Sequence, residues 1–523
     1  MLTWLLVAAA LVLVGVVVYD LTQTRHAILR NFPVIGHFRY LLESVGPELR
    51  QYIVTGNDEE LPFSRDQRSW IYASAKGQNN YIGFGTDNDV EGRPNYLIIK
   101  HETLGRAGLS HHDNANPWHP LPSAKILGGP RGRKHAFRPA SVVNISAMSF
   151  GSLSGAAVQA LNRGAALCGC LHNTGEGGIS SHHLHGGDLT WQLGTGYFGC
   201  RTADGGFDRD AFLRKLEAHP IRAVEIKLSQ GAKPGLGGVL PGKKVTPEIA
   251  AIRGVPEGET VISPAAHRAF RNVDELLDFV EDLADAGGRP VGIKSAIGDL
   301  GFWKELADRM AREERGVDFI TIDGGEGGTG AAPLAFADHV SLPFKVGFSR
   351  VYRVFAERGV HQRITWIGSG KLGFPETALL SFCLGADMVN VAREAMMSIG
   401  CIQAQRCHTD HCPTGVATQN RWLERGLDPT DKSVRLAQYV ANVRKELLRL
   451  SHSCGREHPG LLDSDQMEML DASFGSRSLR EVFGYEPGWE SLAPDDVAAI
   501  RALMAGGITG SGAVGSGAVT ARA

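Results

Sequence analysis

Short apolar segments alternate with helical stretches over most of the sequence from about residue 140 onward. Repeated strand–helix units of this kind predict a parallel sheet covered by helices. Roughly 260–280 residues of this pattern fit a (β/α)8 TIM barrel, and a doubly wound sheet is the alternative. Strands are expected at residues 142–147, 222–228, 290–294, 317–323, 363–367 and 387–391, and helices at 154–167, 273–286, 302–315, 351–358 and 375–384.

The expected strands end in polar, glycine-rich loops, and in a barrel these loops line the active site. Late-strand loops commonly bind phosphate through backbone N–H groups, so a cofactor with a single phosphate, such as FMN, would suit them. Lys294, at a strand end, is expected beside the flavin pyrimidine ring; a surface lysine just past a strand is the alternative. The expected cofactor-binding residues are Lys294, Gly327, Gly328, Thr329, Gly368, Ser369, Gly370 and Arg393.

Three cysteines, Cys401, Cys407 and Cys412, lie within twelve residues at the spacing C-x5-C-x4-C. Thiolates at this density are soft-metal ligands, and iron–sulfur clusters are held by cysteine thiolates. A structural zinc site is the alternative, because His408 or His411 could complete a Cys3His set. The spacing alone leaves both open. Either site implies a reducing compartment.

Three matches to G-x-G-x-x-G, beginning at Gly194, Gly325 and Gly368, do not indicate a dinucleotide-binding fold. A chain with 65 glycines produces such matches readily. None lies in an early βαβ unit with an acidic residue about 20 positions further on. No nicotinamide site is evident, so electrons are expected to arrive from elsewhere, which favours an iron–sulfur cluster over zinc.

Residues 2–19 form one apolar run without a charge, and at about 1.5 Å per residue the run approaches the roughly 30 Å hydrocarbon core. A cleaved signal peptide is the alternative, but no positive residue precedes the run. Arg25, Arg30 and Arg39 follow it, which predicts a single-pass membrane anchor with a cytoplasmic catalytic domain. Apolar residues at 38–42 indicate an amphipathic stretch, expected to pack on a core rather than on the membrane.

The expected organisation is an anchor at 1–20, a linking segment at 21–95, the barrel with its cysteine loop at 96–430, a helical segment at 431–505 and a flexible tail at 506–523. The tail is rich in glycine, alanine, serine and threonine. The formal net charge is −2 and no basic stripe is present, so no nucleic-acid partner is expected.

Several long segments, in the same order, resemble the flavin-binding synthase domain of glutamate synthase. They are residues 146–154, 173–178, 230–242, 245–250, 262–264, 327–331 and 400–419. The resemblance spans residues 130–420 and implies a (β/α)8 barrel, FMN, and a 3Fe–4S cluster on Cys401, Cys407 and Cys412. It also implies addition of ammonia to 2-oxoglutarate, followed by hydride delivery from reduced FMN.

Carried over by motif, Glu176 and Lys233 match catalytic residues beside the flavin and the substrate. Met148, Ser149 and Arg253 match substrate-binding positions, and an arginine fork suits a dicarboxylate. Taken alone, Glu176 could instead cap a turn, and Arg253 could form an ion pair on a helix surface.

The chain departs from the family pattern at Leu236 and Val239, where the family usually has Glu and Gln, so the 2-oxo acid is left open. An apolar run stands where full-length members begin with a glutaminase domain. We therefore expect ammonia from solution or a partner, or another amine donor, and electrons from a donor protein or a membrane carrier. The alternative function is oxidation of another amino or hydroxy acid.

Overall fold

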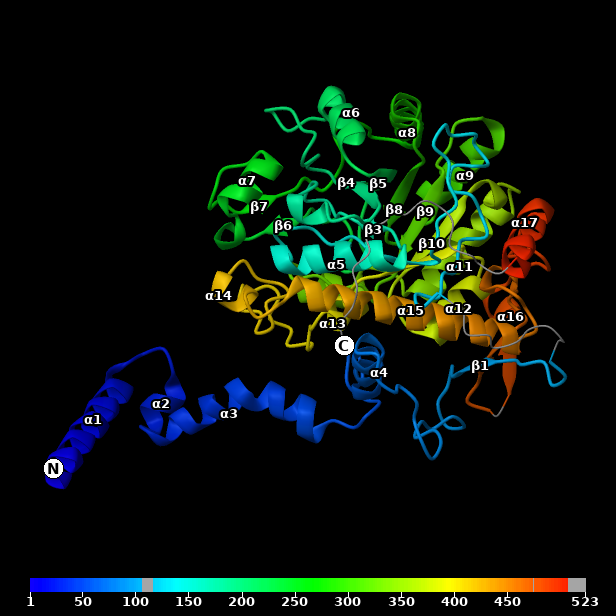
Figure 1. Ribbon diagram of the computed structural model, residues 1–523. Coiled ribbons are helices and arrows are strands. Elements are labelled where there is room, and N and C mark those ends of the chain that lie inside the picture. The colour runs from blue at the N-terminus through cyan, green and yellow to red at the C-terminus, as the bar shows by residue number, and fades with distance from the viewer. Residues whose placement is uncertain (106–115, 474, 507–523) are drawn as a thin grey trace. The chain divides into compact units, whose positions relative to one another are not determined.

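The computed structural model describes residues 1–105, 116–473 and 475–506, and Figure 1 shows its elements. The chain separates into two compact units, Met1–Ser69 and the remainder from Trp70 onward. The tail expected to be flexible lies, apart from Gly506, outside the described residues.

The second unit contains eight parallel strands that close into a barrel in the order β10-β11-β2-β3-β4-β5-β8-β9. This closure confirms the (β/α)8 prediction and excludes the doubly wound alternative. All six strands expected from the sequence are present, and no strand end is shifted by more than two residues. The strands are β2 (Val143–Ile145), β3 (His172–Asn173), β4 (Leu189–Leu193), β5 (Ile221–Lys227), β8 (Val291–Ser295), β9 (Phe319–Asp323), β10 (Thr365–Ser369) and β11 (Met388–Val391).

Helices surround the barrel, and the five expected helices are all found. They are α5 (Gly155–Cys168), α8 (Val273–Gly287), α9 (Gly301–Arg312), α11 (Phe344–Ala356) and α12 (Pro375–Cys383), with α6 (Arg209–Ala218) and α13 (Arg393–Ser398) added. Helix α11 begins seven residues before the expected start at 351, because the buried Phe344 and Phe348 extend its apolar face by two turns. Polar caps fix several helix starts: Ser154 accepts from the backbone N–H of Ala157 in α5.

The barrel interior combines an apolar layer with a buried polar network. Leu127, Ala223, Phe319, Ile367 and Met388 form the apolar cluster. In the polar network, the buried Glu225 carboxylate accepts hydrogen bonds from three neutral side chains: Asn173 (2.8 Å), Gln192 (2.6 Å) and Thr321 (2.7 Å). Because these donors stand on β3, β4 and β9, one carboxylate on β5 links four strands, and its charge is satisfied by hydrogen bonds rather than by a cation.

A long excursion separates β5 from α8. It contains the antiparallel pair β6 (Val239–Leu240) and β7 (Val261–Ile262), with α7 (Pro247–Arg253) between them. Figure 1 shows these three elements grouped on one side of the barrel. The excursion carries two of the predicted site residues, Lys233 and Arg253, so its packing determines where they point.

C-terminal elements cover other parts of the barrel. Helix α15 (Pro429–Ser453) lies along α5, and the contact is close: a Cβ on Gly164 of α5 would stand 2.8 Å from the carbonyl oxygen of Ser433. Helices α14 (Arg421–Glu424), α16 (Leu479–Phe483) and α17 (Pro494–Ala505) also belong to the C-terminal part. Strands β12 (Met467–Leu470) and β13 (Ser476–Ser478) form a small sheet with β1 (Leu97–Ile99), which precedes the barrel.

The first unit begins with α1 (Leu2–Thr22), which is long and apolar enough to cross a membrane and whose apolar window is not buried. Helices α2 (Ala27–Asn31) and α3 (Ile35–Leu49) follow, then a short π-helix at Arg50–Val54; α4 (Arg65–Ala75) crosses the boundary between the units. Residues 38–42 do not pack on a core within the first unit, where Phe38 and Leu41 are 62% and 56% exposed, so their packing on a core stays a prediction.

Gly292 on β8 provides a test of barrel packing. A Cβ at this position would stand 2.4 Å from the carbonyl oxygen and from the ring of Phe319 on the neighbouring strand. We expect Gly292→Ala to lower the free energy of unfolding by about 1–3 kcal/mol through overpacking. Gly298→Ala is the matched control, because nothing lies within 4 Å of its Cβ position. Thermal unfolding followed by circular dichroism measures both; equal melting temperatures for the two variants would contradict the packing described.

Candidate active site

The carboxyl ends of β8, β9 and β10 are joined by one carboxylate, Asp323, the last residue of β9. Its Oδ1 lies 3.4 Å from Lys294 Nζ on β8 and accepts a 2.7 Å hydrogen bond from the Ser369 hydroxyl on β10. Its Oδ2 accepts the backbone N–H of Gly231 at 2.8 Å, from the loop after β5. Lys294 is buried, so the alternative of a surface lysine is wrong.

A second charged group lies at the end of β5, where Lys227 forms an ion pair with Glu176 from the loop after β3. The Nζ–Oε1 distance is 2.7 Å, and the same Nζ donates to Gln230 Oε1 at 2.6 Å. Burial alone would raise the pKa of Glu176. The charge of Lys227, aided by Arg253 and Lys233, nevertheless holds that pKa below its ordinary value, so the carboxylate stays ionised.

Lys233 lies in the loop after β5 and is 2% exposed. Its Nζ donates to the carbonyl oxygen of Gly237 at 2.7 Å. Burial and the nearby charge of Lys227 lower the pKa of Lys233, while Glu176 partly opposes this effect. An ammonium in these surroundings gives up its proton more readily than a lysine in water.

Arg253, the last residue of α7, is buried and not a surface ion-pair residue. It donates from Nη2 to the carbonyl oxygen of Phe150 (3.3 Å), its guanidinium carbon lies 5.1 Å from the centre of the Phe198 ring, and its Nε has no hydrogen-bond partner among the described residues. Burial lowers its pKa to about 10, so the group remains a cation at neutral pH.

Glycines bring the predicted substrate-binding residues together beside Arg253. A Cβ on Gly177 would stand 2.8 Å from both Arg253 Nη2 and Ser149 Cβ, and one on Gly175 would stand 2.8 Å from the backbone nitrogen of Ser149. Met148 is buried beside Ser149 and contributes its backbone carbonyl to this region, 3.5 Å from His183 Nε2. The loops after β2 and β3 can approach Arg253 this closely only because these positions lack side chains.

The predicted phosphate-binding loops also meet one another. A Cβ on Gly328 would stand 2.9 Å from the Arg393 side chain, and one on Gly370, whose φ is +145°, would stand 3.3 Å from Gly324. Arg393 donates to the carbonyl oxygen of Glu326. The Ser369 hydroxyl donates to Asp323, and Gly368 lies against Phe344. Gly327 and Thr329 belong to the loop after β9.

The cysteine loop follows α13 and lies against the excursion. Lys244 donates to the carbonyl oxygens of Cys407 and Ala417, each at 3.0 Å, and Gly330 of the loop after β9 approaches Cys407. Burial, together with the neighbouring Cys407 and Cys412, raises the pKa of Cys401 to about 12, so the thiols lie within electrostatic reach of one another. Within the described ranges, no three His, Cys, Asp or Glu side chains are arranged as a metal site.

The sequence analysis missed Lys227, Gln230, Asp323 and Lys244 as site residues. Lys227 is the last residue of β5, and Lys294 is the next-to-last residue of β8. Because the strand expected from the sequence ran to residue 228, Lys227 was not recognised as a strand-end residue. Asp323 was expected at a strand end, but its contacts with β8, with β10 and with the loop after β5 depend on the order of strands in the closed barrel.

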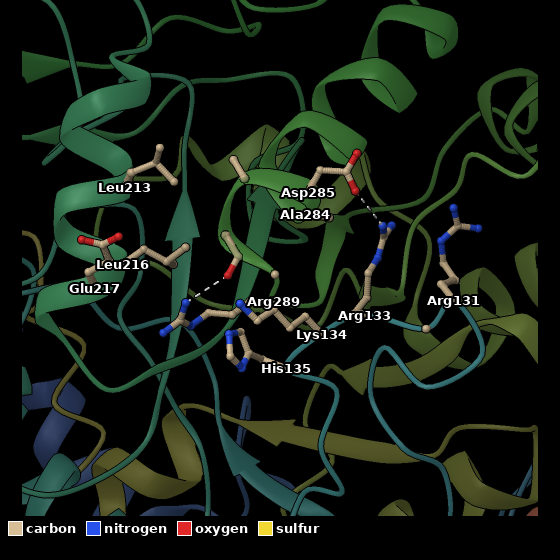
Figure 2. A pocket seen from close by; sticks show the side chains of 14 residues that line it. Arg131, Arg133, Lys134, His135, Leu213, Leu216, Glu217, Ala284, Asp285 and Arg289 are labelled. Carbon is tan, nitrogen blue, oxygen red and sulfur yellow. Dashed lines mark hydrogen bonds and ion pairs between the residues drawn. The ribbon is translucent and has the colours of Figure 1, made fainter.

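A pocket of about 620 Å³ opens elsewhere, among residues that precede β2, β5 and β8 and therefore lie at the amino ends of the strands (Figure 2). Its arginines are used within the fold: Arg133 pairs with Glu281 (2.7 Å) and Asp318 (3.0 Å), and Arg289 donates to the carbonyl oxygen of Gly287 (3.1 Å). Active sites of such barrels lie at the opposite, carboxyl ends, so this pocket is separate from the residues described above.

A closed parallel barrel with buried, charged side chains converging at its carboxyl ends defines a (β/α)8-barrel enzyme. Residues 131–457 match the family model described as "Conserved region in glutamate synthase". The chain is 40% identical to the "Glutamate synthase large subunit-like protein YerD" of Bacillus subtilis (strain 168), over 84% of this chain and 89% of that protein. It belongs to the glutamate synthase family and is an oxidoreductase of the glutamate synthase-like class.

Two further comparisons are more distant. The chain is 34% identical to the "Archaeal glutamate synthase [NADPH]" of Methanocaldococcus jannaschii, over 66% of this chain and 65% of that protein, so it spans slightly less than two thirds of that relative. A crystal structure of mandelate oxidase with (S)-2-phenylpropionate is similar with a TM-score of 0.39 and 15% identity, over 70% of this chain and 84% of that chain. A structural likeness at that level carries no argument about function.

The Lys227–Glu176 pair makes a testable contribution to stability. We expect Lys227→Met to lower the free energy of unfolding by about 3 kcal/mol at pH 7, because it leaves a buried carboxylate without its cation. The pKa of Glu176 is lowered in the folded protein, so the stability from this pair is present above the ordinary value of 4.5 and is lost as the pH falls through the folded pKa. Chemical denaturation from pH 7 down to pH 4 measures the difference.

The matched control is Lys304→Met on the exposed face of α9, which should leave stability within about 0.5 kcal/mol of wild type. A difference between Lys227→Met and wild type that stays constant or grows as the pH falls below 4.5 would show that the pair is not the source of the effect.

Proposed function

We propose that this protein reductively aminates 2-oxoglutarate, or a closely related 2-oxo acid, to the corresponding amino acid. In the net reaction, the 2-oxo acid, ammonium, two electrons and two protons give the amino acid and water. One observation carries the proposal: two buried cations, Lys233 and Arg253, and the half-buried Lys227 surround one carboxylate, Glu176. Three cations and one anion leave a surplus of positive charge that a dicarboxylate substrate would neutralise.

Arg253 is the proposed carboxylate-binding residue. Its fork geometry matches a carboxylate with two parallel hydrogen bonds, and such charge-assisted bonds are the strong ones. The Nε without a partner supports this role, because a buried guanidinium nitrogen left unpaired is costly until a ligand reaches it. Ser149 and Met148, from the loop after β2, would border the same carboxylate.

Lys233 is the proposed proton donor. Formation of the imine from ammonia and a ketone expels the ketone oxygen as water, and this departure requires a proton on the leaving hydroxyl group. The lowered pKa of Lys233 suits the release of a proton from Nζ. Glu176 is kept ionised by Lys227. Its negative charge would partly offset the positive charges of Lys227 and Lys233 and would orient the incoming ammonium.

FMN is the proposed cofactor, and the residues at the ends of β8–β11 fit it. The close approach of Gly328 to Arg393 and of Gly370 to Gly324 leaves backbone groups where side chains would otherwise lie, as a phosphate cradle requires. Gly327, Gly328, Thr329, Gly368, Ser369, Gly370 and Arg393 would hold the phosphate end, and Lys294 would lie at the ring. When bound, the flavin supplies the hydride that reduces the imine carbon.

Cys401, Cys407 and Cys412 are the proposed ligands of a 3Fe–4S cluster. Three thiols outside any disulfide, on one irregular loop, are the right donor set for iron and sulfide. Lys244 and the loop carrying Gly330 hold this segment against the barrel. The cluster would receive electrons from a donor protein or from a membrane carrier, and ammonia or another amine donor would come from solution or from a partner.

Helix α1 is the proposed membrane tether, with the catalytic unit in the cytoplasm. Its length, its apolar composition and its exposed side chains support this role. The cations Arg25, Arg30 and Arg39 follow the helix and favour the cytoplasmic side.

Oxidation of another amino or hydroxy acid is the second candidate function. It is favoured by Leu236 and Val239, each 40% exposed in the excursion that follows Lys233. Apolar side chains there would accept a less polar substrate than a dicarboxylate.

The decisive assay is anaerobic. We expect the reduced, full-length protein in detergent to be reoxidised only when 2-oxoglutarate and ammonium are both present, with one glutamate formed per two electrons. Absorbance spectroscopy follows reoxidation, and amino-acid analysis follows the product. Bleaching of the oxidised protein by an amino or hydroxy acid, without reoxidation by the mixture, would replace the proposal with the second candidate.

The cluster is examined in the same assay by a pair of cysteine variants. Cys407→Ser should lose protein-bound iron and the transfer of electrons from a one-electron donor. Cys454→Ser, at a buried cysteine outside the loop, should retain both. Unchanged iron content in Cys407→Ser would contradict the assignment of this ligand.

A further inference from the structure

Helix α3 carries an apolar stripe that its own unit does not use. Ile35, Phe38, Leu42, Val45 and Leu49 recur at i, i+3, i+7, i+10 and i+14, and with Leu41 they fall within about 120° of the helix circumference. All six side chains are exposed, Ile35 by 77% and Val45 by 39%. An amphipathic stripe normally marks the face that a helix buries.

The contacts that hold α3 within the first unit use other sides of the helix. Gly36 lies against Leu29 of α2: a Cβ on Gly36 would stand 3.0 Å from Leu29 Cδ2. His37 Nε2 lies 2.9 Å from Asp20 Oδ1, near the carboxyl end of α1, and the buried Asp20 also accepts the backbone N–H of Val34. These contacts join the start of α3 to the end of α1 and leave the apolar stripe without a partner in the first unit.

We propose that α3 lies in the membrane interface, with its apolar stripe among the lipid acyl chains next to the point where α1 leaves the bilayer. This inference rests on the proposed tether and extends it: the first unit would be held at the membrane by a spanning helix and by an interfacial helix. The occupant of the stripe is therefore lipid.

Three features of the segment favour lipid. Asp20 and His37 place the beginning of the stripe beside the end of the apolar helix, so a bilayer that holds α1 lies within reach of α3. At 15 residues, α3 is about 22 Å long, too short to span, and it carries Arg39, Glu43 and Glu48 on its polar sides. Arg39 and Arg50 border one edge of the stripe, where long cationic side chains can reach lipid phosphates.

The test uses the full chain in nanodiscs of phosphatidylcholine and phosphatidylglycerol. A fluorescent, environment-sensitive amino acid is placed at position 38, in the stripe, or at position 44, where Ser44 is exposed on the polar side. Lipids with a nitroxide on the acyl chain are the quencher. We expect a blue-shifted emission and at least twofold quenching at position 38, with neither effect at position 44.

The outcomes separate this inference from the tether itself. Two results would overturn both the tether and the role of α3. One is release of the full-length chain from liposomes by alkaline carbonate, and the other is cleavage of the apolar helix α1 from the protein. Retention in the bilayer with a water-exposed probe at position 38 would overturn the role of α3 alone. A probe at position 38 shielded from water but not quenched by nitroxide lipid would also overturn it, because the stripe would then be covered by protein, either the catalytic unit or a second copy.

Discussion

The arrangement of the site depends on three cations, the buried Lys233 and Arg253 and the half-buried Lys227, that share the carboxylate of Glu176. Removing an ion from water costs several kcal/mol even after the protein relaxes, and a neighbouring opposite charge offsets that cost only in part. Lys227 Nζ lies 2.7 Å from Glu176 Oε1. The same carboxylate also attracts Lys233 and Arg253, so three cations share one negative charge. A protein that maintains such an imbalance stabilises an anionic ligand in return, and two carboxylates would restore neutrality.

The barrel makes this imbalance possible by assigning each charge to a different element. Glu176 follows β3, Lys227 ends β5, and Lys233 and Arg253 belong to the excursion between β5 and α8. The same excursion contacts the cysteine loop through Lys244, and the loop after β9 reaches that loop through Gly330. The proposed substrate, flavin and cluster sites are therefore connected by short backbone segments, so a change in the excursion would affect all three.

Much of this arrangement could be predicted from the sequence. The alternation of strands and helices gave the barrel, and the ordered motifs gave Glu176, Lys233 and Arg253. Strand β4 was missed because Thr190 and Gln192 interrupt its apolar pattern, and Gln192 points to Glu225 in the barrel interior. The pairing of Glu176 with Lys227 could not be predicted, because the loop after β3 meets the end of β5 only when the barrel closes. The partner of residues 38–42 could not be predicted either, because an amphipathic stripe indicates burial without specifying what covers it.

We propose that the positive charge of Lys227, Lys233 and Arg253 recognises a dicarboxylate. The most direct measurement is equilibrium binding of 2-oxoglutarate and of 2-oxopentanoate, which lacks the distal carboxylate, to the full-length protein by calorimetry. We expect 2-oxoglutarate to bind at least about tenfold more tightly, a difference of about 1.4 kcal/mol, and Arg253→Gln to remove most of that preference. Equal affinity for the two acids in the unaltered protein would contradict it.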